Sequence, residues 1–187
     1  MSNGFIKVIL VGNPNTGKTS LLNSLTGMRL HVGNWPGKTV EKKEGYFKYG
    51  DYDFNVVDLP GTYSIAPYSE EERVTYAYLR GELADSECAS AACHGGGKRL
   101  RNRQQGCHGS AQCPSIALGQ GTEVIVQTID VNALERNLLM TMELLALGKR
   151  VVLAFNFNQE AKRRGITVDI QAIAEVLQVP VVPIEAN

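Results

Sequence analysis

The stretch Gly12-Asn-Pro-Asn-Thr-Gly-Lys-Thr19 decides the fold of this 187-residue chain. It matches the phosphate-binding pattern G-x-x-x-x-G-K-[ST], and it lies between an apolar, β-branched run at residues 5–11 and a helical run at residues 18–25. Such a loop turns its backbone N–H groups toward phosphate oxygens, and the N-terminus of the following helix adds positive potential. Motif and context together predict a P-loop nucleotide-binding domain, whereas a chance glycine-rich turn would need neither the strand nor the helix.

The side chains of this loop have distinct expected tasks. Lys18 is expected to reach the β- and γ-phosphates, and Thr19 to offer its hydroxyl to Mg²⁺. The loop residues expected to contact the nucleotide are Asn13, Asn15, Thr16, Gly17, Lys18, Thr19 and Ser20.

A second motif, Asp58-Leu-Pro-Gly61, follows an expected strand at residues 52–57. Asp58 is expected to hold Mg²⁺ through water, and the amide of Gly61 to contact the γ-phosphate. Asp-x-x-Gly alone is a common turn. Downstream of a P-loop it indicates the metal-binding edge of a nucleotide site, so we expect Gly61 to act with Lys18 in catalysis.

Between the two motifs, residues 32–39 read Val-Gly-Asn-Trp-Pro-Gly-Lys-Thr and contain the only tryptophan of the chain. The Gly-Asn and Pro-Gly pairs predict a loop. Thr39 is placed to bind Mg²⁺ and to act in catalysis when a γ-phosphate is present, and Asn34 and Trp35 are expected to contact the nucleotide. Loops that order around a γ-phosphate are a common switch device. The alternative is a plain surface loop with a packing tryptophan.

The rest of the chain predicts an α/β domain. Strands are expected at residues 40–49, 52–57, 124–129, 151–155 and 179–183, and helices at 69–83, 133–147 and 168–177. Tyr49-Gly-Asp51 predicts a hairpin turn, and Ser69 is expected to cap a helix whose first turn holds three glutamates. Apolar strands that alternate with amphipathic helices indicate a mostly parallel central sheet flanked by helices.

Residues 86–121 interrupt this alternation. They are rich in Gly, Ser, Ala, Cys and Gln, and we interpret them as a long loop inserted in a single domain that spans residues 1–187. All four cysteines lie here, at Cys88, Cys93, Cys107 and Cys113, and with two histidines they offer ligands for Zn²⁺ or Fe²⁺. Their spacing matches no standard zinc motif, and the low-complexity composition favours incidental cysteines in a disordered insertion.

The composition of the chain limits the kinds of partner that it is expected to bind. The net charge is zero and 43% of the residues are hydrophobic, which allows one packed core and argues against a nucleic-acid partner. No apolar run approaches the ~20 residues of a membrane helix, so we expect the fragment itself to be soluble.

These motifs resemble those of the GTPase domain of the bacterial ferrous iron transporter FeoB. The resemblance rests on the P-loop, on Val32-Gly-Asn-Trp-Pro-Gly37, on Asp58-Leu-Pro-Gly-Thr-Tyr-Ser64 and on Ala133-Leu-Glu-Arg-Asn-Leu138, within residues 5–85 and 122–184. It implies a Ras-like G domain that binds GTP and GDP with Mg²⁺ on the cytoplasmic side of the bacterial inner membrane. The family's helical and membrane transport domains are expected to be missing from this fragment. The resemblance also implies K⁺ as an activator held in part by Asn15, which would thereby support catalysis, and it leaves a homo-oligomer open.

Two positions depart from the family pattern, and one residue within the resemblance differs from Ras-type enzymes. That residue is Thr62, which follows Asp-x-x-Gly where Ras-type enzymes have the Gln that orients water, so hydrolysis is expected to be slow. The base-reading motif Asn-x-x-Asp reads Asn156-Phe-Asn-Gln159, and an amide offers one acceptor oxygen and no charge, which predicts weaker guanine binding and tolerance of xanthine. The family's Ser-Ala pair reads Glu185-Ala186; both are expected at the base, with the N–H of Ala186 meeting the guanine oxygen.

The preferred hypothesis is a switch that binds GTP and hydrolyses it slowly, with moving loops at about residues 28–41 and 59–70. The alternative is a nucleotide-dependent docking module with impaired hydrolysis and relaxed base specificity. A GTPase of ribosome assembly or tRNA modification and a metal-sensing module built on the cysteines are further rivals. The loop around Trp35 argues against the former, and metal content would decide the latter.

Overall fold

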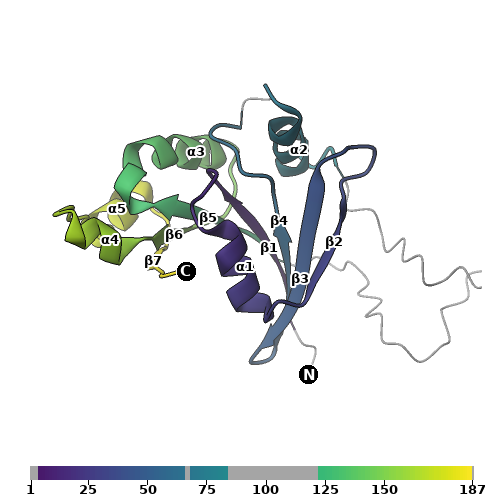
Figure 1. Ribbon diagram of the computed structural model, residues 1–187, viewed down its shortest axis with the longest axis horizontal. Helices are drawn as coiled ribbons and strands as arrows, with labels where there is room; N and C mark the ends of the chain where they lie inside the picture. The colour runs from purple at the N-terminus through teal and green to yellow at the C-terminus, as the bar shows by residue number, and fades with distance from the viewer. Residues whose placement is uncertain (1–3, 66–67, 84–121, 187) are drawn as a thin grey trace, which may run out of the picture. The chain divides into compact units, whose positions relative to one another are not determined.

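The computed structural model describes residues 4–65, 68–83 and 122–186. These residues form a seven-stranded sheet in the order β2-β3-β4-β1-β5-β6-β7 (Figure 1). The strands are β1 (Gly4–Gly12), β2 (Leu30–Asn34), β3 (Glu41–Tyr49), β4 (Tyr52–Asp58), β5 (Thr122–Asp130), β6 (Val151–Asn156) and β7 (Val181–Pro183). β3 pairs antiparallel with β2 and β4, whereas β4, β1, β5, β6 and β7 pair in parallel. The expected α/β domain with a mostly parallel sheet is therefore confirmed.

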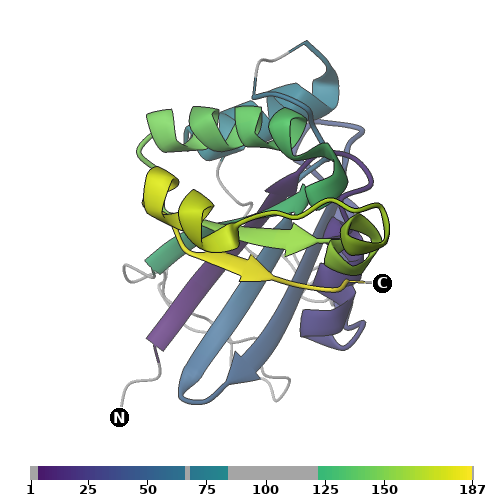
Figure 2. The ribbon, with the colours of Figure 1, turned by 90° about the vertical axis from the view of Figure 1, so that its left-hand side faces the viewer.

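Helices cover both faces of the sheet. They are α1 (Lys18–Thr26), α2 (Glu70–Leu79), α3 (Leu134–Ala146), α4 (Asn158–Arg163) and α5 (Ile170–Leu177), and a 3₁₀ turn, Val131–Ala133, precedes α3. Successive side chains of a strand point to opposite faces. Leu10 of β1 therefore packs with Leu22 of α1, and its neighbour Ile9 belongs to the other core, with Val74 of α2 and Leu144 of α3. Figures 1 and 2 show α1 across the sheet from α2 and α3.

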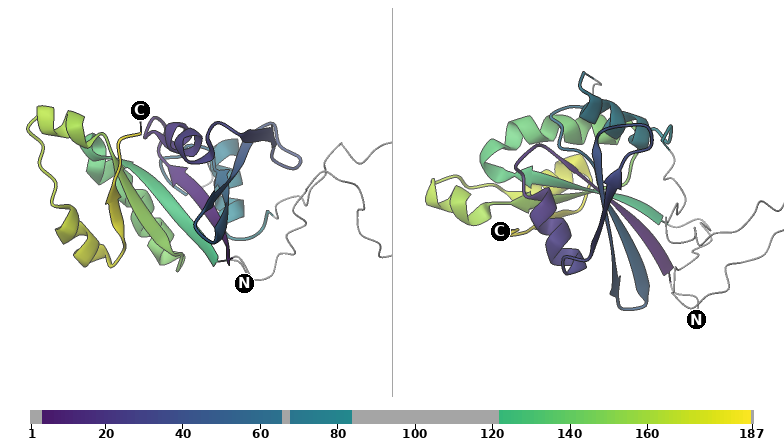
Figure 3. Two further views of the ribbon diagram at one scale, coloured as in Figure 1. Left: turned by 90° about the horizontal axis from the view of Figure 1, so that it is seen from below. Right: turned by 45° about the vertical axis from the view of Figure 1, so that its right-hand side comes forward.

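The parallel pairing of the strands brings the loops that carry the sequence motifs to one edge of the sheet. β4, β1, β5 and β6 are consecutive in the sheet and run the same way, so their carboxyl ends share one edge. The loops after β1, β4 and β6 carry the P-loop, the Asp58 motif and the Asn156 motif, and parallel α/β sheets bind ligands at this edge. α4 and α5 lie toward the β6–β7 end of the sheet, away from β2 and β3 (Figure 3).

The sequence patterns miss two elements of the structure. Part of residues 28–41, predicted to be a loop, forms the edge strand β2, which pairs with β3. α4 has six residues and starts after Phe157, whose left-handed φ of 63° is rare for an aromatic side chain, so no local pattern indicates this helix. The helix predicted over residues 69–83 ends at Leu79.

Two local predictions are confirmed. The side chain of Ser69 accepts the N–H of Glu72 at 3.1 Å, and the Glu72 carboxylate accepts the N–H of Ser69 at 2.9 Å, which together form a capping box on α2. The turn after Tyr49 joins β3 to β4 as a hairpin.

The predicted insertion at residues 86–121, with Cys88, Cys93, Cys107 and Cys113, lies outside the described residues. Within the described ranges, no helix has the length and apolar character needed to span a bilayer. The same ranges contain no group of three His, Cys, Asp or Glu side chains placed to hold a metal ion.

Candidate nucleotide site

The P-loop connects β1 to α1, and its backbone requires glycine at both ends. Gly12 has a φ of 151° and Gly17 a φ of 88°, which disfavour any side chain. A Cβ at Gly12 would lie 2.5 Å from Oγ1 of Thr128, and a Cβ at Gly17 would run into the side-chain amide of Asn156. Strands β5 and β6 therefore press against the loop so closely that only glycine fits.

The interior of the loop is held by side-chain hydrogen bonds. Thr16 Oγ1 donates to the carbonyl of Asn13 at 2.8 Å and lies 2.7 Å from Oγ1 of Thr128. Both Thr16 and Asn13 are buried, so the expected contact of Thr16 with nucleotide would have to come from its backbone. Asn15, by contrast, is exposed at the loop tip with a left-handed φ of 65°. Thr128 was not indicated by any sequence motif, because a threonine inside a strand carries no signal of its own.

The Asp58 motif adjoins the P-loop. The N–H of Thr62 donates to the carbonyl of Gly12 at 3.3 Å, and a Cβ at Gly61 would lie 3.1 Å from Nζ of Lys18. A cavity of about 230 Å³ opens here; its lining residues are Lys18, Thr19, Val40, Glu41, Lys43, Asp58, Leu59, Pro60, Gly61 and Glu71. The structure thus brings together four of the residues predicted from the two motifs: Lys18, Thr19, Asp58 and Gly61.

Burial shifts the pKa values of Asp58 and Lys18, two charged side chains that line this cavity. Burial raises the pKa of the Asp58 carboxyl to about 6, against the opposing effect of the Lys18 and Lys43 cations. Burial likewise lowers the pKa of Lys18, and the charge of Asp58 partly offsets that effect. Among the described residues, Oδ1 of Asp58 is buried and has no hydrogen-bond partner. A desolvated carboxylate oxygen without a partner, in a cavity that Thr19 also lines, fits the hard oxygen ligands that Mg²⁺ prefers.

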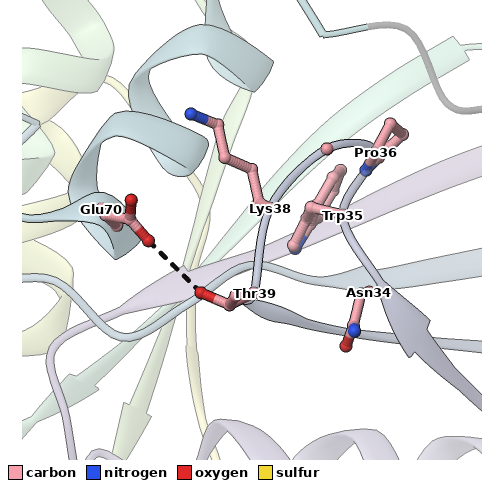
Figure 4. A pocket seen from close by; sticks show the side chains of 7 residues that line it. Asn34, Trp35, Pro36, Lys38, Thr39 and Glu70 are labelled. Atoms are coloured by element: carbon pink, nitrogen blue, oxygen red, sulfur yellow. Dashed lines mark hydrogen bonds between the residues drawn. The ribbon is translucent and has the colours of Figure 1, made fainter.

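The loop around Trp35 lies apart from this cavity. Trp35 is 1% exposed and packs edge-on against Tyr78, with ring centroids 5.2 Å apart, as part of the larger core. Thr39 is exposed, and its hydroxyl donates to Oε2 of Glu70 on α2 at 3.4 Å (Figure 4). A second cavity, of about 540 Å³, is lined by residues 34–39 and Glu70. The structure therefore anchors this loop by its tryptophan and places Thr39 beside α2; the nucleotide contacts expected of Asn34, Trp35 and Thr39 stay predictions.

Asn156, at the carboxyl end of β6, connects three segments. Its Nδ2 donates to the carbonyl of Thr16 in the P-loop at 3.1 Å and to the carbonyl of Ala186 at 3.3 Å. Its Oδ1 accepts the N–H of Phe157 and the N–H of Ala186, each at 2.9 Å. Asn156 therefore ties the loop predicted to read the base to the loop predicted to bind phosphate. The Ala186 N–H that we expected to meet the guanine oxygen is bonded to Asn156 in this structure.

Gln159 and Glu185 meet at the edge of the same site. Both are exposed, and the backbone N–H of Gln159 donates to Oε1 of Glu185 at 3.1 Å. Asn158, which sequence reasoning did not single out, donates through Nδ2 to the carbonyls of Phe155 at 2.7 Å and Ile184 at 3.0 Å. Its position inside the Asn-x-x-Asp-like stretch was the available signal for it.

Comparison with known proteins gives the family. A model of the family described as ferrous iron transport protein B matches residues 6–88 and 113–187. The chain belongs to this FeoB family. The unmatched residues 89–112 fall within the predicted insertion.

Individual FeoB proteins agree with this assignment. A fusion of Fe(2+) transport protein A and Fe(2+) transporter FeoB from Porphyromonas gingivalis is 36% identical over 178 residues, which are 95% of this chain and 17% of that protein. This chain spans about a fifth of the length of the curated relatives it matches.

Solved FeoB domains have the same fold. The G domain of the T. maritima FeoB iron transporter aligns with a TM-score of 0.71 at 33% identity, over 97% of this chain and 88% of that one. A mutant of the S. thermophilus NFeoB protein bound to GDP aligns with a TM-score of 0.71 at 34% identity, over 97% of this chain and 56% of that one. The chain therefore has the fold of a FeoB G domain, which is a P-loop GTPase fold.

Proposed function

We propose that this chain binds GTP and GDP and hydrolyses GTP slowly, as the nucleotide-dependent switch of a ferrous iron transporter. The observation that carries the proposal is the convergence of Lys18, Asp58 and Gly61 on one cavity beside the glycine-bounded P-loop. The similar S. thermophilus domain is bound to GDP, which supports a guanine nucleotide as the ligand.

Each group at the phosphate end of the site has its own role in this proposal. Backbone amides of residues 13–19 and the ammonium of Lys18 hold phosphate oxygens, and this contact relieves the desolvation that lowers the pKa of Lys18. Thr19 and Asp58 would hold Mg²⁺, and Thr39 would join them in the GTP state. When bound, Mg²⁺ neutralises the charge that develops on the phosphate oxygens. We propose that Asn15 helps to hold K⁺, and its exposure at the tip of the loop supports this role.

Slow hydrolysis follows from the position of Thr62. Its side chain is 2% exposed, and its hydroxyl is buried without a hydrogen-bond partner among the described residues. A side chain directed into the protein cannot orient an attacking water as the Gln of Ras-type enzymes does. Water would instead be oriented by backbone groups near Gly61, which we expect to support low turnover.

The loops at residues 28–41 and 59–70 are the proposed switch. Thr39 has to leave Glu70 to reach Mg²⁺ bound at Asp58, and the bond it breaks is long and exposed at 3.4 Å, so its loss costs little. Because Glu70 begins α2, release of Thr39 would also remove a contact between this loop and the start of that helix. We propose that this movement is what the transport domain of the parent protein detects on the cytoplasmic side of the membrane.

A second candidate function rests on Gln159. Its amide stands where the Asn-x-x-Asp pattern has a carboxylate, and this favours a docking module with relaxed base specificity and impaired hydrolysis. The two candidates differ in base preference and in turnover.

Calorimetric titration with non-hydrolysable analogues of GTP, ATP and XTP, in Mg²⁺ with and without K⁺, tests the proposal, together with phosphate release from GTP. We expect preference for the GTP analogue and slow release that K⁺ accelerates. Binding of all three with similar affinity and no release would favour the docking module. Absence of binding to each analogue would refute both functions.

A further inference from the structure

Glu185 lies in the loop after β7, beside Gln159 of the base-reading motif. Residues on either side of it are fixed: the Ile184 N–H donates to the carbonyl of Phe155 at 2.7 Å, and the Ala186 N–H donates to Oδ1 of Asn156 at 2.9 Å. Asn158 adds a bond to the Ile184 carbonyl at 3.0 Å. The backbone of Glu185 is therefore held in place by buried or half-buried groups, while its side chain remains exposed.

The carboxylate of Glu185 lies directly against the start of α4. Its Oε1 accepts the N–H of Gln159 at 3.1 Å, so the charged group stands beside the residue that occupies the usual carboxylate position of the base-reading motif. Each carboxylate oxygen has two lone pairs. The bond to Gln159 uses one of four acceptor sites, and the others can accept donors from a ligand.

Guanine presents hydrogen-bond donors that a carboxylate can accept. Its N1–H and its 2-amino group are adjacent donors, and a charged acceptor binds donors about twice as strongly as a neutral one. Xanthine carries an oxygen at position 2, and adenine presents an unprotonated N1, so a carboxylate repels both. An amide alone distinguishes these bases poorly, because it offers one acceptor and one donor.

We propose that Glu185 is a specificity-determining residue that supplies, from the loop after β7, the guanine-reading carboxylate that Gln159 lacks. In the usual arrangement the loop after β6 carries the acid and the loop after β7 carries a neutral residue. In this chain the arrangement is reversed, with the amide of Gln159 in the first loop and the carboxylate of Glu185 in the second. Asn156 makes this exchange possible, because it holds both loops and the P-loop through its hydrogen bonds. The inference rests on the proposed function and predicts clear GTP preference rather than tolerance of xanthine.

The test measures the affinities of non-hydrolysable GTP and XTP analogues for the full chain and its variants. Glu185→Gln keeps the size of the side chain and removes its charge, and we expect the ratio of GTP to XTP affinity to fall roughly 10- to 100-fold. Glu160→Gln is the matched control, because Glu160 is a neighbouring exposed acid on α4 that pairs with Arg164. It should leave the ratio unchanged.

A double variant separates base reading from helix capping. Gln159→Asp in the Glu185→Gln background returns a carboxylate to the first loop and should restore the GTP preference. If Glu185 acts only as a cap for α4, its substitution lowers both affinities by the same factor and the ratio stays constant, which overturns the inference. A wild-type preference for XTP also overturns it.

Failure of the proposed function gives a different result from failure of this inference. If the wild-type chain binds neither analogue, the proposed function falls and this inference with it. If the wild-type chain prefers GTP and Glu185→Gln keeps that ratio, only the inference falls. Unfolding in urea, followed by the fluorescence of the buried Trp35, verifies that each variant is folded.

Discussion

Substitution of Asp58 by Asn should make the nucleotide-free domain more stable while it removes Mg²⁺ binding. Asp58 is 9% exposed, and burial raises its pKa from the ordinary 3.8 to about 6. The ionised carboxylate is therefore poorly tolerated by the empty fold. The difference between 3.8 and about 6 corresponds to about 3 kcal/mol, at 1.36 kcal/mol per pH unit. Asparagine has the same shape as the protonated acid and avoids that cost.

The size of this stabilisation depends on pH. Because the folded chain holds the Asp58 proton more tightly than the unfolded chain, the stability linked to this proton is complete below about pH 4 and is lost as the pH rises through about 6. The stability gain of Asp58→Asn should therefore reach about 3 kcal/mol at pH 8 and vanish near pH 4. Mg²⁺ affinity of the wild-type protein should fall as the pH drops below about 6, since the metal needs the ionised form.

Urea unfolding in the presence of a chelator, followed by Trp35 fluorescence at pH 4 and at pH 8, measures this gain. Trp35 is the single tryptophan and is buried, so its emission reports global unfolding. Calorimetry of the same variant should show weak binding of the GTP analogue with no dependence on Mg²⁺. A variant that is less stable than wild type at pH 8, or equally stabilised at both pH values, would refute the reasoning from burial.

Three further changes test other parts of the site. Lys18→Ala should weaken binding of the GTP analogue roughly 10- to 100-fold in calorimetry, because a charge-assisted bond to phosphate is lost; unchanged affinity would contradict the assigned role. Gly17→Ala should cost about 1–3 kcal/mol more in urea unfolding than Gly27→Ala. Both have positive φ, but a Cβ at Gly17 meets Asn156 and one at Gly27 meets nothing within 4 Å, so equal costs would contradict the packing. Ser69→Ala should cost about 1 kcal/mol of stability through loss of the capping box; a neutral result would show that α2 does not need its cap.

Much of the fold could be predicted from local sequence. The phosphate motif between a strand and a helix, the apolar strands and the Ser69 cap are all short-range signals, because backbone bonding and side-chain periodicity act over a few residues. These signals were enough to predict the parallel sheet and the positions of Lys18, Thr19, Asp58 and Gly61 at one edge of it. They did not indicate β2, an exposed edge strand that depends on its pairing with β3, or α4, a six-residue helix that starts after a left-handed Phe157.

The tertiary structure decided which side chains meet. Only the tertiary structure shows that Trp35 packs against Tyr78 and that the hydroxyl of Thr39 lies beside Glu70, and the nucleotide contacts expected of both residues stay predictions. Likewise, Gln159 by itself predicts poor reading of guanine, and the pairing of β6 with β7 brings the carboxylate of Glu185 next to it from 26 residues away. Local patterns determine which groups a loop carries, but the distance between two loops is set by the pairing and packing of the strands that bear them.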